Sequence, residues 1–589
     1  MFEVFRKEAA SLLEEVWKEL EMPIESALLE EPMNKQHGDL AYPCFQLAKG
    51  LGKSPAQIAQ EISAAATAKI AAKTSVGGEK SVWGSIVAQV VALGPYVNIS
   101  ASIERCIQDV VNEILTKKDA YGTGSPKKEI ILVESPSPNT NKPLHLGHVR
   151  NMLLGNALCS LLSHAWYEAV RTEVVNDRGV HICKSMLAYQ KFGQEQLPTK
   201  KSDHFVGDYY VRYDQYVQEH PDAEQEIQEM LKKWEDGDVE IRALWEQMNA
   251  RAIAGFATTY KRYGVTMDKQ YFESEHYEHG KDVVYKRYEK GLFTKDEKWN
   301  IVCDLEDVWL GTKVMLRADG TSIYVTQDIA LAQLRYEEYR MDRMVYVVAN
   351  EQEYHFQVLF EVFNRLWFSF APKCYHMSYG MISLPDGKMK SRTWNVVDAD
   401  NLADDMHESA WEILRERYAD MDEKELDHRA EAIAMAAIKF FILKYEASKN
   451  FVFDKQTSLS FEWETWPYVQ YTYARCMSML RKSWEQGMGV DAENTITAED
   501  IGIWWREILV VLSKFPDVIQ QAAERYQPYL VVRYLLDIAH LFNTYYQQVT
   551  ILQAEQAHQK MLRLRLVSAV AQVIHQWLGL LGVETLDQM

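Results

Sequence analysis

Short apolar runs and amphipathic helical stretches alternate through the middle of the chain. The run EIILVE (129–134) precedes a polar loop, a helix-forming stretch and a second run, VRTEVVND (170–177). Apolar runs of this length are typical of buried parallel strands. A strand, a helix and a second strand make a βαβ unit. The pattern therefore predicts the beginning of a doubly wound, Rossmann-like α/β sheet.

The pattern changes on both sides of this unit. Residues 1–120 indicate helices with some strands, and a polar break, YGTGSPKK, follows at 121–128. A charged, Tyr-rich stretch at about 190–300 predicts a helical insertion, after which strand patterns resume with NIVCDL, MLRADGTSIYVTQDI and MVYVVAN. We predict an N-terminal α+β domain at 1–120, an α/β domain at 121–404 and an all-α helix bundle at 405–589.

Composition excludes several classes of protein. The seven cysteines are scattered, which argues against a disulfide framework or a zinc ribbon and suits a reducing cytosol. The sequence has neither an uncharged apolar run long enough to span a membrane nor a secretory signal at its start. We therefore expect a cytoplasmic protein with no membrane partner. The net charge of −20 is only a weak argument against nucleic acid, because an acidic enzyme can carry local basic tracks.

The loop after the first predicted strand carries the clearest chemistry. His145, Gly147 and His148 stand where a helix begins, at the carboxyl edge of the predicted sheet. A helix N-terminus attracts phosphate, and both imidazoles could donate hydrogen bonds to a phosphate oxygen. Gly147 leaves room for a base or ribose to lie on the backbone. The alternatives are a chance His pair on a surface helix and half of a metal site.

The stretch VESPSPNTNKPLHLGHVRNMLLGNAL (133–158) closely resembles the first signature (HIGH) of class I aminoacyl-tRNA synthetases, in the form found in arginyl-tRNA synthetases. Other segments resemble the same family in the same order. HGDLAYPCFQLAKGLGKSP is similar to its N-terminal domain, which contacts the tRNA elbow. DGTSIYVTQDIALA is similar to its substrate loop, and PYVQYTYARCMSMLRK to its anticodon-binding bundle.

The resemblance implies that the chain joins L-arginine to the 3′-terminal adenosine of arginine tRNA. The reaction would pass through an arginyl-adenylate made from ATP, with Mg²⁺ at the phosphates and pyrophosphate released. It also implies a monomer that holds no tightly bound metal or organic cofactor, and binding of tRNA before activation. Two rivals stay open. One is a non-catalytic tRNA-binding paralogue, and the other is a different class I synthetase, such as a cysteinyl enzyme, although no zinc-ligating cysteine set is present.

The family's second signature, KMSKS, corresponds here to KMKSR at 388–392. The chain departs from the family pattern at the fourth position, where Ser391 replaces lysine, and Lys142 is thought to supply that charge. The residues expected to bind ATP are His145, Gly147, His148, Lys388, Met389, Lys390 and Ser391. Those expected to act in catalysis are His145, His148, Lys142, Lys388 and Lys390. For Lys390 and Arg392 a solvated loop charge is an equal alternative.

A guanidinium has five donors in a rigid fork, so its binding site should present carboxylates. The family's arginine-binding positions correspond to Glu134, Asn139, Tyr324, Asp328 and Gln352. Glu134 could instead be a strand-end carboxylate facing water, and Asp328 could cap a helix. Expected tRNA contacts are Tyr468, Tyr471, Tyr473 and Arg475 in the bundle, with Asn34 and His37 in the N-terminal domain. Aromatic and basic side chains suit stacking on unpaired bases, but about half of these tyrosines should pack the bundle.

Several tryptophans stand where arginyl enzymes usually carry glycine or another small residue. The clearest are Trp166, Trp309, Trp394, Trp463, Trp466 and Trp577, and Trp367 is a further candidate. These positions are typical of turns and helix ends, where glycine supplies a positive φ. One hypothesis is that the source reads UGA as glycine, whereas this sequence was translated with UGA as tryptophan. The alternative is that the tryptophans are real.

Overall fold

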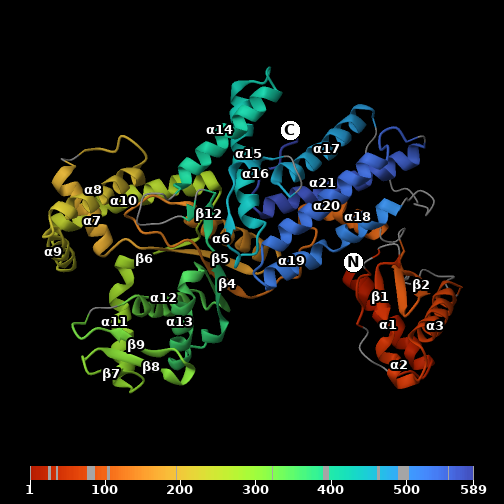
Figure 1. Cartoon of the computed structure of the whole chain (residues 1–589), viewed down its shortest axis with the longest axis horizontal. Coiled ribbons are helices and arrows are strands. Elements are labelled where there is room, and N and C mark those ends of the chain that lie inside the picture. Colours follow the sequence, from red (N-terminus) through yellow and green to blue (C-terminus); the bar gives the residue numbers. More distant parts are fainter. Residues whose placement is uncertain are drawn as a thin grey trace.

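The computed structural model describes the chain except for residues 1, 24–27, 33, 35, 36, 76–85, 103–106, 194, 195, 321, 322, 386, 389–396, 461–463, 488–502, 555, 588 and 589. Figure 1 shows a separate N-terminal unit at one end, a central sheet with its helices towards the other, and a bundle of long helices between them. The order of these parts along the chain is the predicted one.

A parallel sheet forms the centre of the chain. Its five strands lie in the order β11-β10-β4-β5-β6, and every neighbouring pair is parallel. The chain starts at the central strand β4, runs outward to β6 and returns on the other side, so the sheet is doubly wound, as predicted. The strands are β4 (Ile130–Glu134), β5 (Glu168–Val175), β6 (Lys269–Phe272), β10 (Arg343–Ala349) and β11 (Cys374–Tyr379).

Helices cover both faces of this sheet. In β4, Ile131 and Val133 join the core that contains α6, whereas Leu132 joins a second core with α12 and α13. Successive side chains of a strand point to opposite faces, so a strand buried on both sides reads as a continuous apolar run. The crossover helices are α6 (Leu146–His164), α12 (Tyr324–Tyr339) and α13 (Glu353–Arg365).

The helical insertion lies between β5 and β6, but it is shorter than predicted. Residues 269–272 fall inside the predicted range of 190–300 and yet form β6, an edge strand of the main sheet. Its sequence, KQYF, mixes polar and apolar residues because an edge strand is only partly covered. The insertion helices are α7 (Val180–Phe192), α8 (Ser202–Glu219), α9 (Ala223–Glu235) and α10 (Val239–Tyr263).

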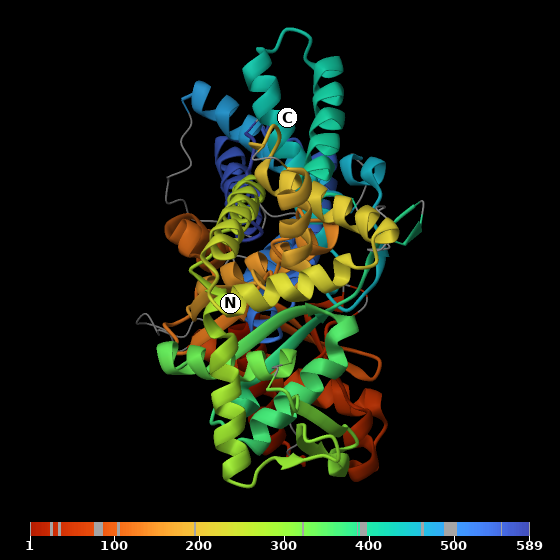
Figure 2. The same ribbon diagram turned by 90° about the vertical axis from the view of Figure 1, so that its left-hand side faces the viewer.

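The run NIVCDL does not join the parallel sheet. It forms β8 in a separate antiparallel sheet, β7-β8-β9, which Figure 2 shows in the lobe at the foot of the molecule. A short apolar run suits a buried strand of either kind, so the pattern could not identify its partners. The run MVYVVAN does form a central strand, β10. The lobe contains α11 (Glu273–Glu289), β7 (Thr294–Lys295), β8 (Ile301–Leu305), η4 (Glu306–Val308) and β9 (Gly311–Leu316).

The N-terminal unit has a core of its own, built on a three-stranded antiparallel sheet of order β1-β3-β2. Among the described residues, ion pairs join it to the C-terminal helices: Arg506 binds Asp39, and Lys514 lies 2.7 Å from Glu31. Its elements are α1 (Phe2–Glu19), β1 (Leu40–Pro43), α2 (Phe45–Leu51), α3 (Pro55–Ser75), β2 (Val87–Leu93) and β3 (Tyr96–Ala101). The linking segment holds η2 (Ile107–Val111), α5 (Asn112–Lys117) and η3 (Lys118–Ala120).

The C-terminal part is helical, as predicted, and its core is continuous with that of α6. Figures 1 and 2 show α14 and α15 side by side, projecting from the body. The helices are α14 (Ala399–Arg417), α15 (Glu423–Leu443), α16 (Lys455–Leu459), α17 (Trp466–Glu485), α18 (Ile503–Ser513), α19 (Phe515–Glu524), α20 (Tyr529–Gln548) and α21 (Ala557–Leu580). A small sheet of β12 (Ile382–Leu384), β13 (Gly387–Lys388) and β14 (Phe451–Val452) lies at their base, and η5 (Asn350–Gln352) and η6 (Ala371–Lys373) flank α13.

Three of the suspected tryptophans do stand at helix ends with a positive φ. Trp166, Trp309 and Trp367 have φ of 64°, 63° and 52°. In each case the next residue's N–H donates to the carbonyl five residues before it, as at Leu310 and Leu305 (3.1 Å). This is the Schellman motif, whose left-handed position favours glycine. The same position after α10, α11 and α21 is occupied by Gly264, Gly291 and Gly582.

The other suspected positions differ. Trp466 begins α17 and Trp577 lies inside α21, and both are buried in ordinary helix rather than in a turn. Trp299, which was not among the tryptophans suspected from the sequence, has a φ of 65°. Trp394 and Trp463 lie outside the described residues. Glu21 and Tyr526 also take a positive φ, so the conformation tolerates a side chain at some cost in free energy.

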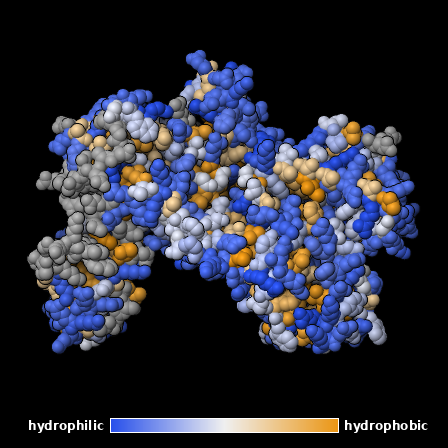
Figure 3. Space-filling model, turned by 180° about the vertical axis from the view of Figure 1, so that it is seen from behind, coloured by the Kyte–Doolittle hydropathy of each residue, from blue (hydrophilic) through white to orange (hydrophobic). Residues whose placement is uncertain are grey.

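The surface in Figure 3 is mainly hydrophilic, with apolar side chains in scattered groups. Among the described residues, no helix combines the length and the hydropathy that crossing a membrane requires.

Candidate active site

The two histidines cap the helix that follows β4. His145 is the N-cap of α6, and its Nδ1 accepts a hydrogen bond from the Gly147 N–H (3.1 Å). The His145 N–H donates in turn to Nδ1 of His148 (3.1 Å). A backbone N–H can only donate, so both Nδ1 atoms are unprotonated, and each neutral ring carries its proton on Nε2. A Cβ on residue 147 would stand 3.0 Å from the His145 ring, so a larger residue would push against the cap.

Both histidines are neutral at physiological pH. Burial, assisted by the charge of Lys142, lowers the pKa of His145 to about 4. Burial, His145 and Lys142 together lower the pKa of His148 well below its usual value. The imidazoles therefore offer neutral N–H donors, and the positive charge at this helix N-terminus comes from Lys142, whose own pKa is lowered by burial. Neutral donors beside one cation suit a polyphosphate.

The first signature is paired by its backbone with the residues that follow the second. The Leu146 N–H donates to the Val397 carbonyl (2.9 Å), and the Ala399 N–H donates to the Leu144 carbonyl (3.0 Å). His145 and Asp398 thus face each other as an antiparallel bridge. In the second signature, the backbone of Lys388, in β13, pairs with that of Ser383, in β12. Its side chain, together with Met389, Lys390, Ser391 and Arg392, lies outside the described residues.

Three neighbouring parallel strands are each followed by a carboxylate at this edge of the sheet. Glu134 ends β4, Asp177 lies just beyond β5, and Glu273 directly follows β6. Asp328 on α12 lies close enough to Glu273 to raise its pKa. The sequence analysis did not predict Asp177 and Glu273 as site residues, although each is the first carboxylate after a strand. Such an edge is where ligands bind in open α/β sheets.

The electrostatics of this cluster would favour a cation. Burial raises the pKa of Glu273 to about 7, and Asp177 and Asp328 add to the rise, while Arg178 and the Gln327 amide (3.0 Å) oppose it. A carboxyl held at this pKa is partly protonated at neutral pH. An arriving cation would shift it to the ionised form and gain the full attraction.

Glu134 is already partnered within the chain. Its Oε2 accepts a hydrogen bond from the buried guanidinium of Arg335, and Ser137 Oγ lies 3.3 Å from its Oε1. No sequence pattern indicated Arg335 as this partner. The alternative of a solvent-facing carboxylate is wrong, because Glu134 is buried. A direct contact between Glu134 and substrate stays a prediction.

The other predicted arginine-binding residues lie at the same edge with exposed or half-exposed side chains. Tyr324 is the first residue of α12 and is 76% exposed, and Asp328 stands one turn later. His355 Nε2 lies 2.7 Å from Asp328 Oδ2, so Asp328 binds a neighbouring helix rather than capping its own. Asn139 pairs through its backbone with Asn176, and Gln352 ends η5; both side chains are exposed.

The comparisons with known proteins agree on one family. The family model for the class I tRNA synthetase (R) catalytic domain matches residues 110–455. The arginyl tRNA synthetase N-terminal domain matches 5–101, and the DALR anticodon binding domain matches 469–589. The arginine–tRNA ligase of Bacteroides thetaiotaomicron is 39% identical over 97% of this chain and 96% of its own length. That of Treponema denticola is 40% identical over 95% of this chain and 94% of its own.

The chain belongs to the arginyl-tRNA synthetase family. Solved structures agree on the fold of this synthetase. The arginyl-tRNA synthetase of Thermus thermophilus superposes with a TM-score of 0.80 at 24% identity, over 99% of this chain and 100% of that one. That of Plasmodium falciparum gives 0.77 at 18% identity, over 99% of both chains. The individual site residues and the domain limits at 120 and 404 stay predictions.

An aromatic platform lies among the described residues of the synthetase's anticodon-binding region. The Arg475 guanidinium lies over two rings, 4.6 Å from the centre of Tyr471 and 4.4 Å from that of Tyr546, and Asn543 Oδ1 accepts from Arg475 Nη1 (2.7 Å). Tyr471 and Tyr546 are about 40% exposed. The sequence analysis did not predict a role for Tyr546, because Tyr546 lies on α20, far along the chain from α17.

Not every predicted tRNA contact has a free face. Tyr473 is buried and stacks on His575, so its ring packs the bundle, as expected for about half of these tyrosines. Tyr468 is half-buried. In the N-terminal unit, Asn34 and His37 are exposed and lie 3.3 Å apart through Nδ2 and Nε2.

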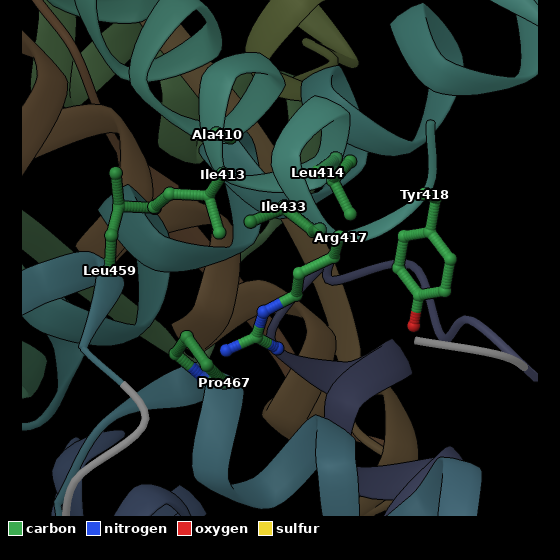
Figure 4. Close-up of a pocket in the computed structure, with 8 residues that line it drawn as sticks. All are labelled: Ala410, Ile413, Leu414, Arg417, Tyr418, Ile433, Leu459 and Pro467. Carbon is green, nitrogen blue, oxygen red and sulfur yellow. The ribbon is translucent and has the colours of Figure 1, made fainter. Parts of the chain in front are cut away.

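A small apolar pocket among α14–α17 is separate from the synthetase's candidate site (Figure 4). It measures about 10 Å³, which leaves room for one water at most. None of the predicted site residues lines it. The lining residues are Ala410, Ile413, Leu414, Arg417, Tyr418, Ile433, Leu459 and Pro467.

Proposed function

We propose that this synthetase joins L-arginine to the 3′-terminal adenosine of arginine tRNA, with ATP as the energy source. The observation that carries this proposal is the juxtaposition of two sites at one sheet edge. Carboxylates follow β4, β5 and β6, and neutral imidazoles with Lys142 stand at the mouth of α6. The first set suits a guanidinium, and the second suits a triphosphate.

In the first step, a carboxylate oxygen of arginine attacks the α-phosphorus of ATP in line. The bond from that phosphorus to the bridging oxygen breaks, and pyrophosphate leaves. No protein nucleophile is required, so the enzyme contributes positioning and electrostatics. The Nε2–H groups of His145 and His148 stabilise charge as it develops on phosphate oxygens, and Lys142 supplies the positive charge that Ser391 does not.

In the second step, the 2′-hydroxyl of the terminal adenosine attacks the carbonyl carbon of the arginyl-adenylate. The ester forms and AMP leaves. The Tyr471–Arg475–Tyr546 platform would hold unpaired anticodon bases, and Asn34 and His37 would meet the tRNA elbow. Binding of tRNA before activation is part of this proposal.

Arginine would be selected by charge and shape together. Asp328 and Glu273 offer acceptors to the planar fork, and Tyr324 stands one turn before Asp328. Lysine fills only part of such a site and would leave acceptors unpaired once the substrate covers them, each at a cost of about 1–3 kcal/mol. Citrulline matches the shape but lacks the charge that ionises Glu273. Asn139 and Gln352 would hold the α-amino end.

Further elements of the proposal come from family membership. The reaction serves protein synthesis in the cytoplasm, Mg²⁺ accompanies ATP on its phosphates, and the enzyme acts as a monomer without a tightly bound organic cofactor.

The test is pyrophosphate exchange into ATP, measured with and without arginine and arginine tRNA. Exchange that needs both is the expected result. Exchange with arginine alone would support the proposed ligase activity but contradict the requirement for tRNA before activation. Exchange with a different amino acid would identify another class I synthetase, and tRNA binding without any exchange would identify a non-catalytic paralogue.

A further inference from the structure

A network of partly buried charges joins the helical insertion to the start of α14. Lys201 Nζ donates to Asp400 Oδ2 (2.6 Å), Asp203 Oδ2 (2.9 Å) and Thr259 Oγ1 (2.6 Å). His204 Nε2 lies 3.0 Å from the same Asp400 oxygen. Asp203 and Thr259 are fully buried. Three elements therefore meet here: the start of α8, the last turns of α10 and the first turn of α14.

The network lies two residues from the backbone that holds the first signature. Asp398 caps α14 by accepting from the N–H groups of Asp400 (2.9 Å) and Asn401 (3.1 Å). Its carboxylate lies 3.4 Å from His204 Nε2, and its backbone forms the bridge to His145. The Tyr263 hydroxyl on α10 also donates to the carbonyl of Ala399 (2.8 Å). The insertion is thus hydrogen-bonded to residues 397–399, the strand-like segment that pairs with His145.

The physical chemistry of the network makes it rigid. Burial acts to raise the pKa of Asp400, but hydrogen bonds from His204 and Lys201 lower it to about 2, so the carboxylate is ionised. The bond to Asp400 raises the pKa of His204. Moving α14 away would remove Asp400 from Lys201, which is the partner of the fully buried Asp203. Disturbing the partner of a buried charge is costly. At Gly255 of α10, a Cβ would clash with Asp203 at 2.3 Å, so α8 and α10 pack closely at this point.

We propose that Asp400, held by Lys201 and His204, is a positioning residue for adenylate formation, through which the insertion sets the placement of His145. The proposal rests on the proposed function, because the reaction it concerns is the activation of arginine. None of the network residues needs to touch substrate. Their effect reaches the site through the pairing of residues 144–146 with 397–399.

The test compares D400N with D404N. Asp404 pairs with Arg262 and also links α14 to α10, but it stands one turn farther from the bridge and is largely exposed. In arginine-dependent pyrophosphate exchange with tRNA present, we expect D400N to lower kcat by about tenfold to a hundredfold, because small displacements of a catalytic group have effects of this size. The KM values for arginine and ATP should stay within about twofold, since no binding contact is lost. D404N should match wild type.

A second readout does not depend on catalysis. Hydrogen exchange at the Leu146 and Ala399 amides, which form the bridge, should be faster in D400N and unchanged in D404N. Equal kcat and equal exchange in the two variants would overturn the proposal. If D400N did not fold, H204Q would take its place with the same expectations. If wild type showed no arginine-dependent exchange, the proposed function would fail, while amide exchange would still decide whether the network positions the bridge.

Discussion

Replacing Trp309 with glycine should make the protein more stable. Trp309 has a φ of 63° at the left-handed position of a Schellman motif, and its side chain is 95% exposed. Removing it therefore sacrifices almost no packing. The left-handed conformation costs an L-residue about 1–2 kcal/mol, whereas glycine adopts it freely.

The gain is reduced because glycine is more flexible in the unfolded chain, by about 0.5–1 kcal/mol. The net expectation for W309G is a stabilisation of about 0.5–1 kcal/mol. Trp166 and Trp367 stand in the same motif after other elements, so the effects should add, to about 1.5–3 kcal/mol for the triple variant. Trp166 is only 46% exposed, so its share should be the smallest.

The measurement is the melting temperature by calorimetry. A change of 1 kcal/mol moves Tm by about 2–4 °C in a domain of 150–250 residues, so the triple variant should melt several degrees higher. W484G is the matched control. Trp484 is 55% exposed but lies in the last turn of α17, where glycine should destabilise by up to about 1 kcal/mol. If W309G lowered Tm as W484G does, the reasoning from backbone strain would be refuted.

The same positions test the coding hypothesis directly. If the source reads UGA as glycine, peptides of the native protein that cover residues 166, 309 and 367 will have the mass of glycine. Trp234 and Trp245, which pack on each other in the insertion, should remain tryptophan. Codons other than UGA at the three positions would remove the hypothesis and leave the stability prediction intact.

Four further predictions concern the substrate sites. D328N should raise the arginine KM by about tenfold or more, because charged hydrogen bonds contribute about 1.5–3 kcal/mol. The control is E337Q, which changes an exposed carboxylate on the same helix and should leave this KM unchanged; equal effects would contradict the assignment of Asp328. Arginine affinity should fall as pH drops below about 7, because Glu273 must lose its proton to bind a cation, and E273Q should abolish that dependence. Y546A should raise the KM for tRNA by about tenfold or more, because stacking contributes about 1–3 kcal/mol per base. H148N should lower kcat by about 10²–10³-fold with little change in KM.

Local pattern alone determined much of this protein. The buried strand at 129–134, the helix that begins with HLGH and the helical C-terminal part all follow from periodicity and from the residues that can begin a helix. These features depend on neighbours within a few residues. The same holds for Trp166 and Trp309, whose unsuitability for a helix end is a property of backbone conformation.

Tertiary structure alone decided the partners. The edge strand β6 is half polar and has no local signature, and β8 has the composition of a central strand but pairs in another sheet. Arg335 neutralises Glu134 from 201 residues away, and Asp398 meets His145 only because α14 begins beside α6. Period and propensity state which face of an element is apolar. Which distant group pairs with a buried charge depends on how the elements pack. In the low-dielectric interior a charge without a partner costs free energy, so the packing that supplies the partner is favoured.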